Sequence, residues 1–241
     1  MINEDMTLKG RVRVSKYDAQ TGLLICENEH GNTATDWARA VLTSLILTPP
    51  NADTTALTLS RPLYIALGTG LGTPASNDMS MFAEVFGTRK AFSYTSSMQA
   101  YVAQMTSNYG TTDPTGTFTE AGLWDADVST ISLAADVAEG ATSITVPSDA
   151  PAVQGSTTPG QYTTIYISDG SNSEYASIAL STSSGATTWQ LQAPLQYSHS
   201  SGVSITAFTG NLWGHVAFAA PGETKGQGQI LVVQWSDYIL A

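Results

Sequence analysis

The stretch Leu63-Tyr-Ile-Ala-Leu-Gly-Thr-Gly-Leu-Gly-Thr-Pro-Ala-Ser-Asn-Asp78 turns from a strand into a glycine-rich hinge within a few residues. Its first part, 64–67, is short and apolar, as expected for a buried strand. Gly68, Gly70 and Gly72 then follow at every second position, which leaves one face of the chain without side chains. Another part of the protein can therefore pack closely against this face.

The residues after the hinge, 78–90, form a short apolar segment with charged ends. They do not form the long helix whose free N-terminus would hold a phosphate. The hinge is not a nucleotide-binding loop either, because its Gly-x-Gly-x-Gly spacing differs from G-x-G-x-x-G and no Gly-Lys-Ser/Thr follows. We interpret it as a structural hinge and expect no cofactor.

The composition indicates a mainly β protein. The chain has 241 residues, of which 42% are hydrophobic and only 12% are charged. It is therefore large and apolar enough for one large β domain or two small ones. Short runs of Thr, Val, Ile and Tyr alternate with Gly, Pro and Ser, which is typical of antiparallel strands joined by turns. We expect an antiparallel β-sandwich or jelly-roll-like domain that contains one α-helix.

The charge is strongly acidic and unevenly distributed. The net charge of −11 argues against free nucleic acid as a partner, because phosphate binding requires a basic face. Lys9, Arg11 and Arg13 nevertheless lie close together near the N-terminus, and in a strand they share one face. One interpretation is a solvated strand face. The other is a contact with an acidic neighbour, such as another copy of this chain.

The cysteine and histidine content predicts no metal site and no catalytic residue. The single cysteine, Cys26, cannot form an internal disulfide and is expected to be a small buried apolar residue. His30, His199 and His215 lie far apart in the sequence and lack the spacing of a zinc site. We therefore expect each histidine to be an ordinary turn or strand residue.

Two groups of acidic residues are candidates for a functional site. Glu120 and Asp125 are close enough in sequence to form the carboxylate pair of a glycosidase. Backbone hydrogen bonds or a pairing with Arg89 explain Glu120 better, so we expect the chain not to be an enzyme. Residues 169–174 offer oxygen ligands for calcium, but they lack the ligand spacing of a calcium loop and are expected to form a β-turn.

The sequence indicates neither a signal peptide nor a membrane-spanning segment. The N-terminus Met1-Ile-Asn-Glu-Asp lacks the basic and apolar regions of a signal peptide. No run of about 20 apolar residues is present. We expect a protein that is made and assembled in a cytoplasm, with no membrane partner.

One helix can be predicted, over residues 35–47. Trp37 and Leu45 belong to one apolar stripe with helical spacing, so we expect both to face the sheet. Thr35 or the next residue can cap the helix, and Pro49 follows its end.

Two other local elements follow from the pattern of turns and alternation. Residues 7–31 read as a hairpin, with turn-forming residues at 18–22. Residues 91–105 alternate well enough to be predicted as a single strand.

The segment 129–208 differs from the rest in composition. It is rich in Ser and Thr and contains neither Lys nor Arg. Six short β runs at roughly ten-residue spacing predict a small barrel or sandwich. We expect a discontinuous outer domain, 1–128 and 209–241, which makes the assembly contacts and into which 129–208 is inserted as a second β domain. The insertion point is predicted to be a hairpin between 123–125 and 212–214, because hairpin tips tolerate insertions.

Several motifs of the outer domain occur in an order that resembles a family of tailed-bacteriophage structural proteins. They are Tyr64-Ile-Ala-Leu-Gly-Thr-Gly, Asn77-Asp78 leading to Glu84 and Arg89, Thr119-Glu-Ala-Gly-Leu-Trp-Asp125, and Gln229-Ile-Leu-Val-Val-Gln-Trp235. Such proteins are tail, baseplate or collar components. The resemblance implies assembly rather than catalysis.

The segment 129–208 resembles a small β module that recurs in phage virion proteins. The residues that carry this likeness are Leu133-Ala-Ala, Gly140-Ala-Thr-Ser-Ile-Thr-Val146, Ile165-Tyr-Ile-Ser-Asp-Gly170, Glu174 and Pro194-Leu-Gln-Tyr-Ser-His199. The module usually carries Gly-Asp before the strand at 165, where this chain has Gly160-Gln161, so a different turn is expected there. Neither resemblance supplies catalytic residues.

These observations together predict a non-enzymatic structural component of a tailed-phage virion, in the tail, baseplate or neck, with copies of itself and other virion proteins as partners. The alternatives are a capsid decoration protein, or a carbohydrate-binding module that contacts a surface glycan through aromatic residues of 129–208. The predicted assembly contacts are Lys9, Arg11, Arg13, Met79, Met81 and Phe82.

Overall fold

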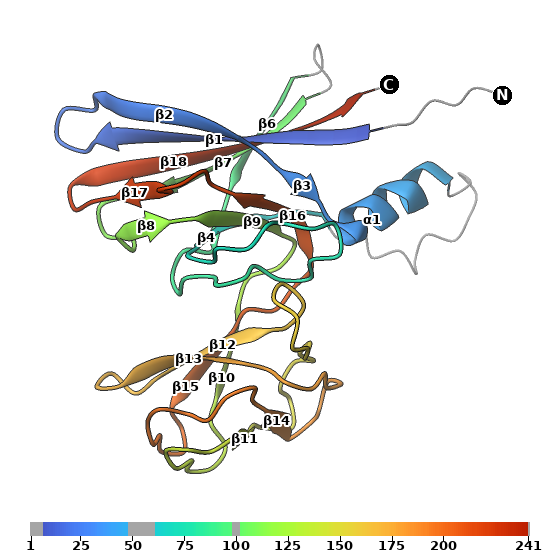
Figure 1. Cartoon of the computed structure of the whole chain (residues 1–241), viewed down its shortest axis with the longest axis vertical. Coiled ribbons are helices and arrows are strands. Elements are labelled where there is room, and N and C mark those ends of the chain that lie inside the picture. Colours follow the sequence, from blue (N-terminus) through green and yellow to red (C-terminus); the bar gives the residue numbers. More distant parts are fainter. Residues whose placement is uncertain (1–6, 48–60, 98–101, 241) are drawn as a thin grey trace.

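The computed structural model describes residues 7–47, 61–97 and 102–240. It is mainly β, as predicted, and every pairing between its named strands is antiparallel. Two five-stranded sheets lie one above the other, and residues 129–208 form a further lobe beneath them (Figure 1). We call the two sheets the sandwich and the segment 129–208 the insert.

The upper sheet of the sandwich has the order β2-β1-β18-β7-β6. Its strands are β1 (Thr7–Asp18), β2 (Leu24–Gly31), β6 (Ser93–Ser97), β7 (Val102–Tyr109) and β18 (Gln229–Leu240). The first and last strands of the chain pair along their whole length, which brings the two ends of the chain together.

The predicted hairpin at 7–31 is confirmed by the pairing of β1 with β2. One carboxylate oxygen of Asp18 accepts hydrogen bonds from the backbone N–H groups of Gln20 and Thr21, which fixes the turn. Gly22 completes the turn with φ of +69°, a conformation that favours glycine.

The prediction of one strand over 91–105 is wrong. The chain forms β5 (Lys90–Ala91) in one sheet, then β6 and β7, which pair as a hairpin in the other. The alternation in the sequence gives no sign of the break between β6 and β7. Residues 95–101 contain no Gly, Pro, Asn or Asp that would mark the reversal in the sequence.

The lower sheet has the order β3-β16-β9-β4-β5. Its remaining strands are β3 (Thr33–Ala34), β4 (Tyr64–Gly68), β9 (Glu120–Trp124) and β16 (Leu212–Ala217). A two-stranded ribbon of β8 (Gly116–Phe118) and β17 (Glu223–Lys225) lies beside the sheets.

Helix α1 (Asp36–Leu47) matches the predicted range. The side-chain oxygen of Thr35 accepts a hydrogen bond from the N–H of Ala38 at 3.3 Å, so Thr35 is the N-cap. The predicted orientation of Trp37 is wrong: it is 41% exposed, whereas the small side chain of Ala38 is buried. Helix α1 contacts β16, and Ala38 takes the inner position. The side chain of Leu45 lies outside the described residues.

The core of the sandwich lies between the two sheets. Alternate residues of β1, β7 and β18 meet alternate residues of β4, β9 and β16, as the strand period of two requires. The buried members are Val12, Val14, Ile65, Leu67, Met105, Tyr109, Phe118, Ala121, Leu123, Val216, Phe218, Leu231, Val233 and Trp235.

The insert has sheets and a core of its own. Six strands form the sheets β10-β15-β12-β13 and β11-β14. They are β10 (Ser129–Ser132), β11 (Ser143–Thr145), β12 (Thr164–Ser168), β13 (Ser173–Ser177), β14 (Thr188–Gln190) and β15 (Ser204–Ala207). Trp189 is fully buried among the apolar side chains of this core.

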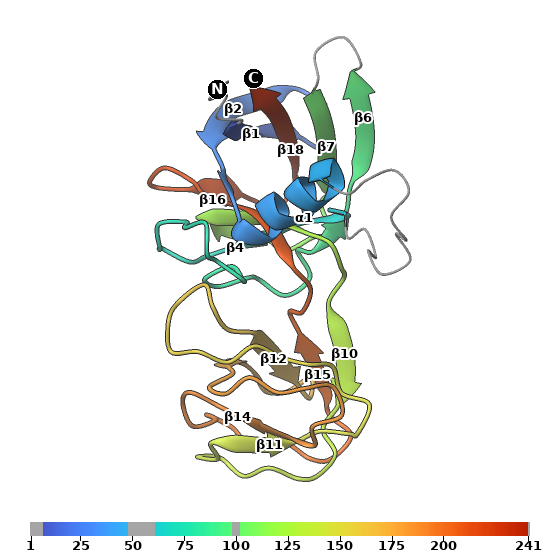
Figure 2. The same ribbon diagram turned by 90° about the vertical axis from the view of Figure 1, so that its right-hand side faces the viewer.

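Two connections join the insert to the sandwich, and they run close together (Figure 2). The first leaves the end of β9 and the second enters the start of β16. These two strands pair with each other, with Trp124 opposite Leu212 and Leu123 opposite Gly214. The insert therefore begins and ends at one point of the lower sheet.

Candidate functional site at the junction of the sandwich and the insert

The glycine-rich hinge lies on the side of the lower sheet that faces the insert. A Cβ atom on Gly70 would stand 2.4 Å from Cβ of Phe82 and 2.6 Å from a carboxylate oxygen of Glu120. A Cβ atom on Gly72 would meet the ring of Phe82 at 2.4 Å. The close packing predicted for the face without side chains is confirmed, because Phe82 and Glu120 occupy it.

Glu120, in β9, holds the hinge and the following segment against the sheet. Its carboxylate accepts backbone N–H groups from Gly70 at 3.0 Å, Ala83 at 2.7 Å and Phe82 at 3.1 Å. The residue has no exposed surface. A buried carboxylate needs several such donors, so Glu120 here positions loops rather than facing a substrate.

His215, in β16, bridges two buried carboxylates. Its Nδ1 lies 2.7 Å from Asp78 and its Nε2 lies 2.7 Å from Glu120. Burial on its own would lower the pKa of His215, but the hydrogen bonds to Asp78 and Glu120 outweigh this and raise the pKa above its ordinary value. Only the imidazolium can donate to both carboxylates at once. The ring of Phe82 packs against the imidazole of His215, with the two ring centroids 4.7 Å apart.

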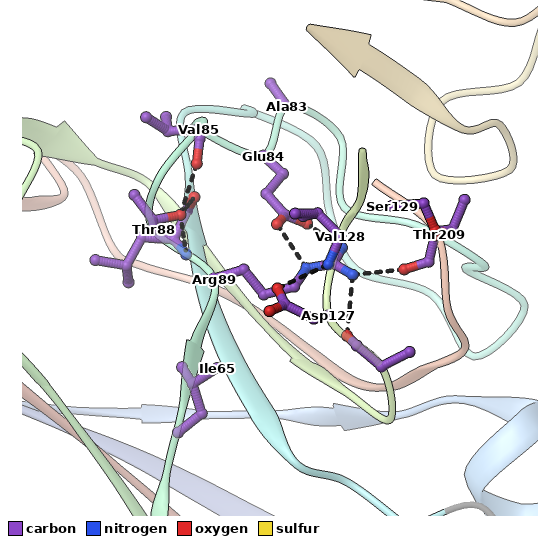
Figure 3. A network of polar contacts seen from close by, with 12 residues as sticks. Ile65, Ala83, Glu84, Val85, Thr88, Arg89, Asp127, Val128, Ser129 and Thr209 are labelled. Carbon is purple, nitrogen blue, oxygen red and sulfur yellow. Dashed lines mark hydrogen bonds and ion pairs between the residues drawn. The ribbon is translucent and has the colours of Figure 1, made fainter. Parts of the chain in front are cut away.

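Arg89 joins the sandwich to both connections of the insert (Figure 3). Its Nε and Nη2 donate to the two carboxylate oxygens of Glu84 at 2.8 and 2.7 Å. Its Nη1 donates to the backbone carbonyls of Ala126, at 3.2 Å, and Thr209, which lie in the sandwich on either side of the insert. The guanidinium also lies 4.0 Å from the ring centroid of Trp124. One side chain therefore fixes the entry and the exit of the insert.

Glu84 carries the negative charge that balances the buried guanidinium of Arg89. Both side chains of the pair are only 2% exposed. Burial raises the pKa of Glu84, and the ion pair with Arg89 opposes that rise. The bidentate geometry orients the guanidinium so that its third nitrogen points to the connections.

The insert also contacts the segment that follows the hinge. The carbonyl of Gly160 accepts the N–H groups of Met79 at 2.6 Å and Ser80 at 2.9 Å. Gly160 has φ of +80°, and a Cβ there would lie 2.6 Å from a carboxylate oxygen of Asp78. Gly160, which Gln161 follows in the sequence, therefore lies at the contact between the two lobes.

Aromatic residues of the insert complete the contact. Phe86 of the sandwich stacks on Tyr166, with ring centroids 4.5 Å apart. The backbone N–H of Phe86 donates to the hydroxyl of Tyr175 at 2.8 Å. Trp189 is buried in the core of the insert, whereas Tyr175 and Tyr197 remain 47% and 39% exposed.

The backbone hydrogen bonds expected for Glu120 are confirmed, and Asp125 is also hydrogen-bonded within the chain. Asp125 accepts the backbone N–H and the side-chain amide of Asn211, both at 2.7 Å. The predicted partner of Glu120, Arg89, pairs instead with Glu84. Within 7–47, 61–97 and 102–240, no three His, Cys, Asp or Glu side chains are arranged to hold a metal ion.

Two of the predicted basic contact residues form ion pairs with acidic residues of the same chain. Arg11 lies 2.6 Å from Glu29 of β2, and Arg13 lies 3.7 Å from Glu27 and 3.9 Å from Glu29. All four charges are on the solvent side of the upper sheet. The side chain of Lys9 lies outside the described residues.

The three predicted apolar contact residues differ in their exposure to solvent. Met79 is 47% exposed, but Met81 is only 2% exposed because it packs on Trp124 and Leu212 inside the lower sheet. Phe82 covers the glycine hinge. Met79 is therefore the most exposed of the three, and Met81 is buried in the folded chain. Contacts with a partner through these residues stay a prediction.

The sequence analysis does not predict one exposed run of apolar residues. Leu23, Leu24 and Ile25, at the tip of the β1–β2 hairpin, are 68%, 52% and 49% exposed. The sequence pattern predicts an ordinary strand at these positions. The absence of alternation in three consecutive apolar residues beside a turn is the signal that could have revealed them.

No family model matches the chain, and no curated protein matches it. Among the helices of the described part, none is both long and apolar enough to span a membrane.

Proposed function

We propose that this chain is a non-enzymatic structural component of a tailed-phage virion, located in the tail, baseplate or neck. The observation that carries the proposal is the use of the buried polar groups at the junction. Arg89, Glu84, His215 and Glu120 are all engaged in holding loops and connections together. This chemistry makes a rigid two-lobed subunit, which is what a protein that acts by shape requires.

The motifs that carry the phage resemblance support the same proposal. Three of the four outer-domain motifs lie in β4 with its hinge, in β9 and in β18, three strands that contribute to one core. The glycines of the first motif have a packing role, as does Glu120 of the third. The resemblance therefore rests on residues that build this architecture.

The partners in this proposal are copies of the chain and other virion proteins. An exposed run of large apolar residues is unusual on a monomer and is typical of a surface that a partner covers. Leu23, Leu24 and Ile25 form such a run on an edge strand of the upper sheet. Edge strands of this kind are normally protected or paired.

Immunogold electron microscopy of purified particles tests the proposal, with antibodies raised against the insert. We expect label at the tail, baseplate or neck. Label spread over the capsid shell would instead support the alternative of a decoration protein. A chain found in infected cells but absent from purified particles would contradict the structural role.

A further inference from the structure

The two carboxylates that His215 bridges differ in how firmly the rest of the chain holds them. Glu120 accepts backbone N–H groups from residues 70, 82 and 83 in addition to the imidazole. The oxygen of Asp78 that faces His215 accepts one other donor within the described residues, the backbone N–H of Ala75 at 2.9 Å. Asp78 therefore depends on His215 more than Glu120 does.

A neutral His215 cannot serve both carboxylates. Neutral imidazole carries a single N–H group, so its other nitrogen would present a lone pair to a buried carboxylate. That carboxylate would lose a charge-assisted hydrogen bond and would need to reach water instead. Because Glu120 keeps its backbone donors, we expect Asp78 to be the carboxylate that leaves.

The segment that carries Asp78 is also a contact between the sandwich and the insert. The backbone N–H groups of Met79 and Ser80, the next two residues, donate to the carbonyl of Gly160. A Cβ on Gly160 would lie 2.6 Å from a carboxylate oxygen of Asp78, so the two residues are in close contact. Movement of Asp78 would therefore disturb the hydrogen bonds to the insert.

The charged groups around His215 come from several elements. Asp78 and Glu120 face it directly, and Glu120 lies within electrostatic range of Glu84, which Arg89 balances. The other charged groups on elements packed against β16 form pairs of their own: Asp36 with Arg39 on α1, and Glu27, Glu29 and His30 of β2 with Arg13, Arg11 and Glu223. Strand β2 also carries the thiol of Cys26, and β3 contributes no titratable side chain.

We propose that His215 is a pH-dependent switch that controls the contact between the segment after the glycine hinge and the insert. While the imidazole is charged, Asp78 stays on the lower sheet, and Met79 and Ser80 stay bonded to Gly160. When the imidazole is neutral, Asp78 turns to water and these two hydrogen bonds break. The switch is a property of the folded chain, so it does not depend on the proposed virion role.

The contact is closed on the acidic side and opens as the pH rises. Burial alone would lower the pKa of His215, but its hydrogen bonds to the two carboxylates raise the pKa above the ordinary value of 6.5. The imidazolium is therefore present below this raised pKa and is lost as the pH passes through it. The insert stays attached in both states, because Arg89 holds its two connections and Phe86 stacks on Tyr166.

Hydrogen–deuterium exchange of the full chain, resolved to single amides, tests the switch at about pH 6 and about pH 9. The rates are corrected for intrinsic exchange at each pH. The protection of the Met79 and Ser80 amides should fall about tenfold or more at the higher pH, since loss of a hydrogen bond to a charged group has this effect. The amides of Gly70 and Ala83, which Glu120 holds, should keep their protection.

Three matched variants separate His215 from the other histidines. His215→Gln removes the titrating group, so the protection at positions 79 and 80 should become the same at both pH values. His30→Gln and His199→Gln are the controls, because these histidines contact other buried carboxylates, those of Glu223 and Glu174. Both controls should keep the pH dependence at positions 79 and 80, and far-UV circular dichroism should show that each variant is folded.

Three results would overturn the inference. The first is unchanged protection at positions 79 and 80 of the wild-type chain across this pH range, a result that needs no variant to fold. The second is an equal loss of protection at positions 70 and 83, which would mean that the whole hinge loosens rather than the Asp78 end. The third is a pH dependence at positions 79 and 80 that survives in His215→Gln.

Discussion

Arg89 and Glu84 form a bidentate ion pair at the point where the insert joins the sandwich, with both side chains 2% exposed. The same guanidinium binds the carbonyls on either side of the insert. The pair therefore couples the position of the insert to the segment that follows the glycine hinge.

Replacing Arg89 by Met should destabilise the protein strongly. The change leaves Glu84 buried without its partner, which costs about 3–5 kcal/mol in the free energy of unfolding. Urea denaturation measures this. Arg39→Met is the matched control, because Arg39 is exposed and lies 4.0 Å from Asp36, and it should cost less than about 0.5 kcal/mol. A similar small loss for Arg89→Met would show that the buried pair does not hold the junction.

Gly70→Ala should destabilise the hinge. The added Cβ would collide with Phe82 and Glu120, and overpacking of this kind costs about 1–3 kcal/mol. Gly31→Ala is the control, since no atom lies within 4 Å of the added Cβ and its φ is not positive. Thermal denaturation of the two variants should separate them clearly; equal melting temperatures would mean that the hinge accommodates a side chain.

His215 should make stability depend on pH. Its pKa is raised in the folded state above the ordinary value of 6.5. Its contribution is therefore fully present below the pKa of the unfolded chain, and it is lost as the pH rises through the folded pKa. We expect the stability difference between wild type and His215→Gln to be larger at pH 6 than at pH 9, measured by urea denaturation. A difference that is constant across this range would argue against an imidazolium at this position.

The sandwich should fold without the insert. Replacement of 129–208 by a short Gly-Ser link leaves β9 paired with β16, and it retains Ala126 and Thr209 for Arg89. The main losses are the Gly160 contact and the stacking of Phe86 on Tyr166. A single cooperative melt of the shortened chain is expected in calorimetry. A chain that no longer melts cooperatively would show that the two lobes depend on one core.

Local patterns allowed the fold class, the hairpin at 7–31 and the helix at 36–47 to be predicted, because turn residues and periodicity mark them directly. The split of 91–105 into two strands left no such mark. Trp37 was placed wrongly since a stripe on a helix shows which residues are apolar, but it does not show which face the sheet approaches.

The sequence predicted that the glycine hinge is a close-packing surface. It did not predict which side chains pack there. Phe82 lies nearby in sequence, whereas Glu120 and His215 come from strands far along the chain. The Arg89 junction depends in the same way on Thr209, 120 residues away. Contacts of this range follow from strand order, which local patterns do not specify.

The central claim is that this chain is a repeated structural subunit of the virion. A cryo-electron microscopy map of the purified particle, with this two-lobed structure fitted, tests it most directly. The account predicts several copies arranged about the symmetry axis of the tail, baseplate or neck. A map of those regions whose density is fully explained by other chains, with no copy of this one, would contradict it.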